Sequence, residues 1–262
     1  MKRATLISSL LVIALLIVST VFVPAASADA GKTRVIVQFA PGQKGAVEGA
    51  LKSARAEFHY AFDELDAFAV TLPVAALKGI QNNPNVVLVE EDAERYPISI
   101  MPSKVEAPQA LAATVPYGID MVQARDVWDT NRDGVVDADA PTGVGRKICI
   151  IDSGFYTGHE DFQGINVSGY AGNLPWDVDK FGHGSHVAGT IAAMNNALGV
   201  VGVTPGTVSL YIVRVFGDDG AWAYASTLID AAYKCRDAGA NIISMSLGGA
   251  KSNRTEQNGF NT

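Results

Sequence analysis

The chain has 262 residues, of which 48% are apolar and 18% charged, a composition that excludes general disorder and allows one or two domains with buried cores. Lys and Arg number 20 against 27 Asp and Glu, so the net charge is −7. This acidic balance, without a dense basic patch, argues against nucleic acid as a partner. Two cysteines are too few for a disulfide framework or a four-thiolate zinc site.

Residues 1–28 have the pattern of a cleavable secretory signal peptide. Two basic residues, Lys2 and Arg3, precede an apolar run over 6–23, and a small-residue site follows at 26–28. The alternative is a transmembrane anchor, because the run is almost long enough to span a bilayer. The small-residue site favours cleavage, so we expect a secreted, extracellular protein without a stable membrane anchor.

Secretion into an oxidising compartment allows the two cysteines to pair. Cys149 and Cys235 then either form a disulfide, or Cys149 remains a buried free thiol within an apolar strand. The sequence does not give their separation, so both alternatives stay open.

Residues 29–94 are expected to form a small α+β domain. Alternating polar and apolar residues predict strands over 33–40 and 67–72, and a third strand is predicted over 86–89. Apolar residues at helical spacing predict a helix over 43–58.

Residues 95–114 contain three prolines and little periodicity, which predicts an exposed linker that is open to proteolysis. We expect the maturation cleavage between Ala107 and Val115.

Residues 115–262 alternate between apolar runs and segments of helical composition. The expected strands cover 147–151, 208–216 and 241–246, and the expected helices cover 184–194 and 221–238. Strands separated by helices predict an α/β fold with a parallel sheet and right-handed crossovers. Ligands of such folds gather at the carboxyl ends of the strands.

Two polar residues stand out in this second part. Asp152 follows a buried strand in the string IDSG, although an aspartate in such a string is more often a turn residue. His183 is flanked by glycines in GHGSHVAGTIAA, which lets the backbone approach another element closely. An alternative is a metallohydrolase that uses His183 and His186 as a metal pair, but no third ligand is evident nearby.

The strings IDSG, GHGSHVAGTIAA and SMSLGG occur in this order, and VPYGI precedes them at 115–119. Together they resemble the subtilisin-like serine proteases (subtilases, peptidase S8). The resemblance implies a three-layer α/β catalytic domain over 115–262, preceded by a ferredoxin-like inhibitory propeptide of the I9 type. It also implies that Asp152 orients His183 and that His183 is the general base. Ser246, Leu247 and Gly248 would bind an extended peptide substrate along their backbone.

The same resemblance leaves one part missing. In the family the nucleophilic serine lies in a Gly-Thr-Ser-Met-Ala string downstream of the histidine, and that string does not occur here. We therefore expect a C-terminally truncated precursor, whose nucleophile and oxyanion-hole asparagine lie beyond Thr262 and which is inactive as written.

A calcium site is implied by similarity to a loop of the family that follows the histidine helix. The implied ligands are side-chain oxygens of Asp161 and Asn196 and backbone carbonyls of Met194, Leu198 and Val200. One family ligand, a glutamine, is replaced by Ala113 here.

A second candidate calcium loop resembles the start of an EF-hand or dockerin loop. Its oxygens alternate along the chain, with glycine at the sixth position and no acid at the twelfth. The candidate ligands are Asp129, Asn131, Asp133 and Asp137. A solvated acidic turn is the equal alternative.

We therefore expect a secreted serine endopeptidase precursor that acts on protein or peptide substrates, with structural calcium and its own propeptide as intramolecular inhibitor. The alternative is an inactive fragment or pseudoprotease that serves as a calcium-stabilised binding module.

Overall fold

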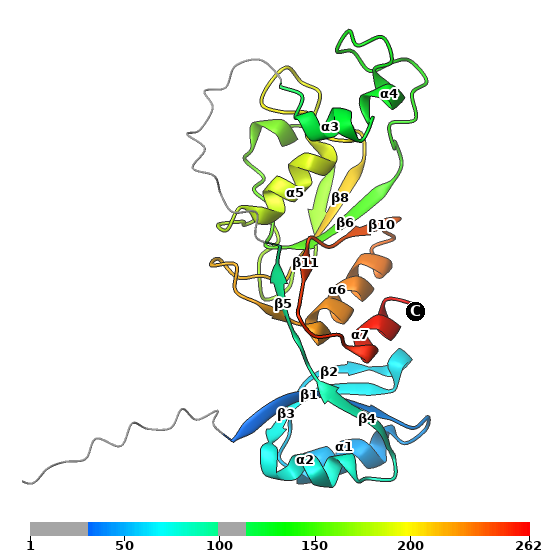
Figure 1. Cartoon of the computed structure of the whole chain (residues 1–262), viewed down its shortest axis with the longest axis vertical. Coiled ribbons are helices and arrows are strands. Elements are labelled where there is room, and N and C mark those ends of the chain that lie inside the picture. Colours follow the sequence, from blue (N-terminus) through cyan, green and yellow to red (C-terminus); the bar gives the residue numbers. More distant parts are fainter. Residues whose placement is uncertain (1–30, 99–113) are drawn as a thin grey trace, which may run out of the picture.

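The computed structural model describes residues 31–98 and 114–262, which fold into two parts joined by a short strand (Figure 1). The expected signal peptide lies outside the described residues. Within the described ranges, no helix is both long and apolar enough to cross a membrane.

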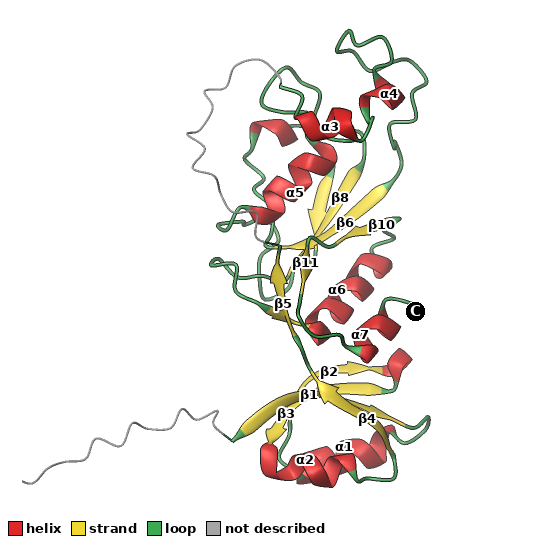
Figure 2. Ribbon diagram, in the orientation of Figure 1, coloured by secondary structure: helices red, strands yellow, loops and turns green. Residues whose placement is uncertain are grey.

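The N-terminal half is a βαββαβ unit, the ferredoxin-like arrangement. Its elements are β1 (Lys32–Phe39), α1 (Lys44–Ser53), β2 (Glu57–Phe62), a short 3₁₀ turn η1 (Asp63–Leu65), β3 (Ala67–Pro73), α2 (Val74–Gln81) and β4 (Val86–Glu91). The antiparallel sheet has the strand order β2-β3-β1-β4. Helices α1 and α2 cover one face of this sheet (Figure 2).

Helix α1 is shorter than the sequence predicts. Arg55 adopts a left-handed backbone conformation with φ 58°, and the amide of Ala56 bonds the carbonyl of Leu51. This closure is a Schellman-type end, which usually uses glycine. The chain then enters strand β2, where helical spacing had predicted more helix.

The C-terminal half contains a parallel sheet of strand order β10-β6-β8-β7. Its strands are β6 (Lys147–Asp152), β7 (Val167–Gly169), β8 (Ser209–Arg214) and β10 (Ile242–Ser244). Its helices are α3 (Tyr117–Met121), α4 (Arg125–Trp128), η2 (Glu160–Phe162), α5 (His183–Ala192), α6 (Ala225–Asp237) and α7 (Arg254–Gly259). The prediction of a parallel α/β sheet is confirmed.

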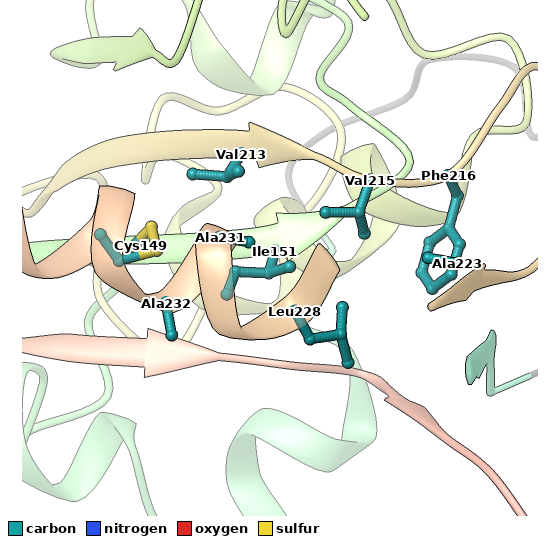
Figure 3. Close-up of a cluster of buried hydrophobic side chains, with 10 residues drawn as sticks. Cys149, Ile151, Val213, Val215, Phe216, Ala223, Leu228, Ala231 and Ala232 are labelled. Carbon is teal, nitrogen blue, oxygen red and sulfur yellow. A yellow bond between two sulfur atoms is a disulfide. The ribbon is translucent and has the colours of Figure 1, made fainter. Parts of the chain in front are cut away.

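The sheet is covered on both faces, which makes a three-layer architecture. Ala188 and Ala192 of α5 pack on one face, and Leu228 and Ala231 of α6 pack on the other (Figure 3). Because both faces are covered, the strands are almost continuously apolar. Cys149 of β6 and Cys235 of α6 form a disulfide within the core on the α6 side of the sheet. Of the two alternatives that the sequence left open for these cysteines, the structure therefore contains the disulfide.

A third sheet joins the two halves. Strand β5 (Glu94–Pro97) pairs antiparallel with β11 (Leu247–Gly248) on one side and with β9 (Ala223–Tyr224) on the other. Figure 1 shows β5 running from the N-terminal unit into the C-terminal half. The exposed linker expected from Arg95 onward therefore begins as a paired strand, and the cleavage expected between Ala107 and Val115 falls mostly outside the described residues.

Candidate active site

The structure brings together the two residues that the motifs single out. Asp152 ends strand β6, and His183 is the first residue of helix α5. The Nδ1 of His183 lies 2.7 Å from Oδ1 of Asp152. The two side chains that the resemblance pairs therefore meet at one edge of the sheet.

The close contact between the start of α5 and the turn after β6 depends on two glycines. A Cβ on Gly184 would lie 2.2 Å from the carbonyl oxygen of Gly154, and a Cβ on Gly154 would lie 2.1 Å from the carbonyl oxygen of Val178. Gly154 also has a φ of 119°, which side chains rarely adopt. The start of α5 therefore sits directly against the turn after β6, as the glycine pattern indicates.

Asp152 is fully buried, and burial raises the pKa of its carboxyl above the ordinary value. The hydrogen bonds from His183 and from the amide of Ser153 act in the opposite direction. The second oxygen, Oδ2, is buried with no hydrogen-bond partner among the described residues. A buried anion with one free oxygen is well suited to stabilise positive charge on the adjacent imidazole.

A second carboxylate holds the histidine helix in place, and the sequence analysis did not single it out. Asp179 accepts hydrogen bonds from the Ser153 hydroxyl (2.8 Å), the Gly182 amide (2.8 Å), and the amide and hydroxyl of Ser185 (2.8 and 2.6 Å). The Ser153 hydroxyl in turn accepts the Gly184 amide at 2.9 Å. A carboxylate at a helix N-terminus satisfies amides that lack helical partners. The sequence signal that could have identified Asp179 is its position four residues before His183, just before the start of α5.

The outer nitrogen of His183 faces a backbone group. Its Nε2 lies 3.1 Å from the carbonyl oxygen of Ile98, which follows strand β5. Both ring nitrogens thus face oxygen atoms, Nδ1 that of a carboxylate and Nε2 that of a backbone carbonyl. A cavity of about 340 Å³ beside this contact is lined by Ile98, His183, His186 and Ser246, among others.

The three residues with an implied role in substrate binding lie beside the segment of the chain that ends at Ile98. The amide of Ile98 donates to the carbonyl of Ser246 at 2.9 Å, and Leu247 and Gly248 pair with Pro97 and Tyr96. The backbone edge at 246–248 therefore binds an extended segment of the chain itself.

The histidine pair does not form a metal site in the described part of the chain. His183 is held by Asp152, whereas His186 is exposed one turn further along α5. No group of three or more His, Cys, Asp or Glu residues there is arranged to hold a metal ion.

The first candidate calcium loop is folded around Asp161. This buried carboxylate accepts the amide of Val200 at 3.2 Å, and its backbone carbonyl accepts the amide of Met194. Asn196 accepts the amide of Leu198 through its side-chain oxygen. Burial raises the pKa of Asp161, and the side chain facing it with potential positive charge is His159, at 3.7 Å.

In the second loop the candidate ligands bond to the loop itself. Asn131 and Asp133 accept the amides of Asp133 and Val135, and Asp137 accepts both the amide and the hydroxyl of Thr130. Asp129 is buried and accepts the amide of Gly134 at 3.3 Å. This pattern is that of a hydrogen-bonded turn.

Comparisons with known proteins agree with this geometry. The profile of the Subtilase family (Peptidase S8) matches residues 143–260. Subtilisin E of Bacillus subtilis (strain 168) is 35% identical over 194 residues, which cover 72% of this chain and 43% of subtilisin E. Fervidolysin from Fervidobacterium pennivorans, a keratinolytic enzyme related to subtilisin, has a TM-score of 0.57 at 18% identity, over 87% of this chain and 37% of fervidolysin.

Residues 143–260 therefore belong to the subtilase family, and the chain has a subtilisin-like α/β fold. It spans less than half the length of subtilisin E.

Proposed function

We propose that this chain is the N-terminal part of a secreted serine endopeptidase precursor, in which His183 is the general base and Asp152 its orienting anion. The observation that carries the proposal is the 2.7 Å contact between the two side chains at the rim of a parallel sheet, beside a backbone edge that already binds an extended segment.

The chemistry follows from the two nitrogens of His183. Asp152 accepts a hydrogen bond from the Nδ1–H group, so the neutral ring carries its lone pair on Nε2. That lone pair takes the proton of a serine hydroxyl as the hydroxyl attacks the scissile carbonyl, and the imidazolium later protonates the leaving amine. No serine hydroxyl of the described residues is hydrogen-bonded to His183, so we propose that the nucleophile is supplied by sequence that these 262 residues do not include.

We further propose that the N-terminal unit is an intramolecular inhibitor. Strand β5 occupies the edge on which substrate would lie, and its end reaches His183 through Ile98. Asp92, at the end of the unit, accepts the amide of Ser226 in the first turn of α6 (2.9 Å) and the Ser226 hydroxyl (2.6 Å). Glu90 accepts the amides of Arg254 and Thr255 at the start of α7. Acidic side chains on helix N-termini thus fix the unit in place.

We propose that the first processing cut falls at the peptide bond after Ile98. The proposal is supported by the carbonyl oxygen of Ile98, which lies 3.1 Å from Nε2 of the proposed base. Removal of the remaining residues up to Val115 would then be a second step.

Calcium at the Asp161 loop is part of the proposal. Asp161 is a buried carboxylate, and among the described residues its ion-pair partner is His159, at 3.7 Å. Asp161 and the side-chain oxygen of Asn196 would hold the ion, with carbonyls of Met194, Leu198 and Val200, and the ion would stabilise the loop after α5. The turn around Asp133 fits a metal less well, because its oxygens already accept the loop's own amides.

A fluorophosphonate probe that labels reactive serines tests the catalytic proposal. We expect labelling and peptide cleavage for the product of the complete reading frame and loss of both with His183→Ala. The 262-residue chain alone should stay unlabelled. Stoichiometric labelling of Ser246 in that chain would contradict the proposed source of the nucleophile. No activity from the complete product would favour a binding module.

A further inference from the structure

A buried ion pair joins the strand in the cleft to the C-terminal half. Arg95 of β5 donates through Nε to Oε1 of Glu256 at 2.9 Å and through Nη2 to Oε2 at 2.5 Å. Arg95 is 5% exposed and Glu256 is 9% exposed. Two parallel hydrogen bonds between a guanidinium and a carboxylate, both shielded from water, make a strong and geometrically selective contact.

The register of the strand gives this pair its place relative to the reacting centre. Ile98 presents its carbonyl to His183, and Pro97 and Tyr96 pair with Leu247 and Gly248. Arg95 is three residues before Ile98 and pairs with Ala223. Numbered from the bond after Ile98, Arg95 is therefore the fourth residue on the N-terminal side, P4.

Glu256 lies in the first turn of α7, where a glutamate ordinarily helps to cap the helix. It is the third residue of α7, and its amide is capped by the side chain of Asn253 at 2.8 Å. A glutamate at this position commonly reaches back to the cap amide. Here its carboxylate turns to Arg95, and Arg95 is its ion-pair partner within the described ranges.

Departure of strand β5 would leave the Glu256 carboxylate facing an open, partly buried subsite. A buried carboxylate without a cationic partner is unfavourable, so a substrate that returns a guanidinium to this position gains affinity and one that places an apolar or acidic side chain there loses it. Arginine fits better than lysine, because two donors match the two carboxylate oxygens.

On the basis of the proposed protease function, we propose that Glu256 is a specificity-determining residue and that the enzyme prefers peptides with arginine at P4. The preference comes from the pairing that Arg95 makes in the precursor, which a substrate strand reproduces in the same register.

Internally quenched peptides test the preference with the processed product of the complete reading frame. They share one sequence and carry Arg, Lys, Leu or Glu at P4. We expect kcat/KM for the Arg peptide to exceed that for the Leu peptide about ten- to a hundredfold, with Lys between them and Glu lowest. Equal kcat/KM for the Arg and Leu peptides would overturn the inference and leave the proposed function intact. No cleavage of any peptide would contradict the proposed function itself.

Two variants locate the preference. Glu256→Gln keeps the shape of the side chain and should reduce the Arg preference to less than about threefold, with the Leu peptide little affected. Lys251→Gln is the matched control, because Lys251 forms an exposed ion pair with Glu91 at the same boundary and should leave the preference unchanged. A full Arg preference in a folded Glu256→Gln enzyme would overturn the assignment. If that variant does not fold, the peptide series with the unaltered enzyme still decides.

Discussion

The two halves of the molecule position functional groups in different ways. In the C-terminal half, parallel strands and their helices bring side chains from distant positions, Asp152 and His183, to one edge of the sheet. The N-terminal unit contributes backbone and charge instead, through strand β5 and through the acids Glu90, near the end of β4, and Asp92, just after it. Under the proposed function, the first arrangement carries out the chemistry and the second blocks it with an extended strand and a few anchors.

The halves also differ in how their cores are closed. The parallel sheet is covered on both faces by its own helices. The antiparallel sheet has α1 and α2 on one face, and its other face packs Ile36 and Phe62 against Ile229 of α6. The N-terminal unit therefore completes its core only when it is docked on the C-terminal half.

The largest effect on stability is expected from the disulfide. Replacing both Cys149 and Cys235 by alanine removes a cross-link between β6 and α6 that spans 86 positions in the sequence. The free energy of unfolding should fall by about 4 kcal/mol, because the unfolded chain is no longer constrained. Chemical denaturation measures this change, and reduction of the unaltered chain is the matched comparison. An unchanged unfolding midpoint would mean that the bridge does not stabilise the C-terminal half.

The next largest effect is expected at the boundary. Asp92→Ala leaves Arg34 and both donors of Ser226 without their acceptor. Docking of the N-terminal unit should weaken by about 3 kcal/mol, since a buried anion and its partners are disrupted. Binding of separately expressed 31–98 to the C-terminal half is one readout if both parts fold. Protection of the full chain from limited proteolysis is a second.

Glu91→Gln is the control for this boundary prediction. Glu91 forms its ion pair with Lys251 at the surface, where both side chains are more than half exposed. Its loss should cost less than about 1 kcal/mol. Equal effects of the Asp92 and Glu91 variants would refute the claim that buried caps anchor the unit.

The effect of Asp161→Asn on the melting temperature should change sign when calcium is added, which tests the proposed calcium loop. The folded-state pKa of Asp161 is raised, so between its ordinary and folded values the native state binds more protons, and stability falls as pH rises through that window. At neutral pH and in chelator, Asp161→Asn should leave the melting temperature equal or higher. With millimolar calcium the unaltered chain should become the more stable of the two. Equal calcium responses in both chains would exclude Asp161 as a ligand.

The smallest effect concerns His59 in strand β2. Burial lowers its pKa below the ordinary 6.5, and the positive charge of Arg34 lowers it further, against Glu57 and Asp92. The folded unit then binds fewer protons than the unfolded chain, so stability is lost as pH falls from about 6.5 through the folded value. His59→Gln should reduce the difference between melting temperatures at pH 7.5 and pH 5.5. An identical difference in both chains would show that His59 is not the acid-sensitive group.

The sequence predicted the parts of the fold in which local pattern and tertiary structure agree. The apolar strand 147–151 and the glycine-flanked His183 lie where expected, because carboxyl ends of parallel strands meet at one edge. The helix predicted over 43–58 is longer than the observed helix, which ends at Ser53. The left-handed backbone of Arg55 ends it without the usual glycine.

Contacts between residues far apart in sequence could not be predicted. Prolines made the segment from Arg95 resemble a linker, yet its strand is stabilised by partners some 130 and 150 residues away. Pro97, which lacks an amide hydrogen, is tolerated because it is the last residue of β5. The pairing of Arg95 with Glu256, which are 161 positions apart, could not be predicted for the same reason.

The most direct test is the mass and N-terminal sequence of the secreted product of the complete reading frame, with and without His183→Ala. If His183 is the base and Ile98 presents the bond, the unaltered protein is cut after Ile98 and the variant accumulates uncut. Cutting after Ile98 at the same rate in the variant would contradict the catalytic role of His183, and an unaltered protein that is never cut there would contradict the role of strand β5.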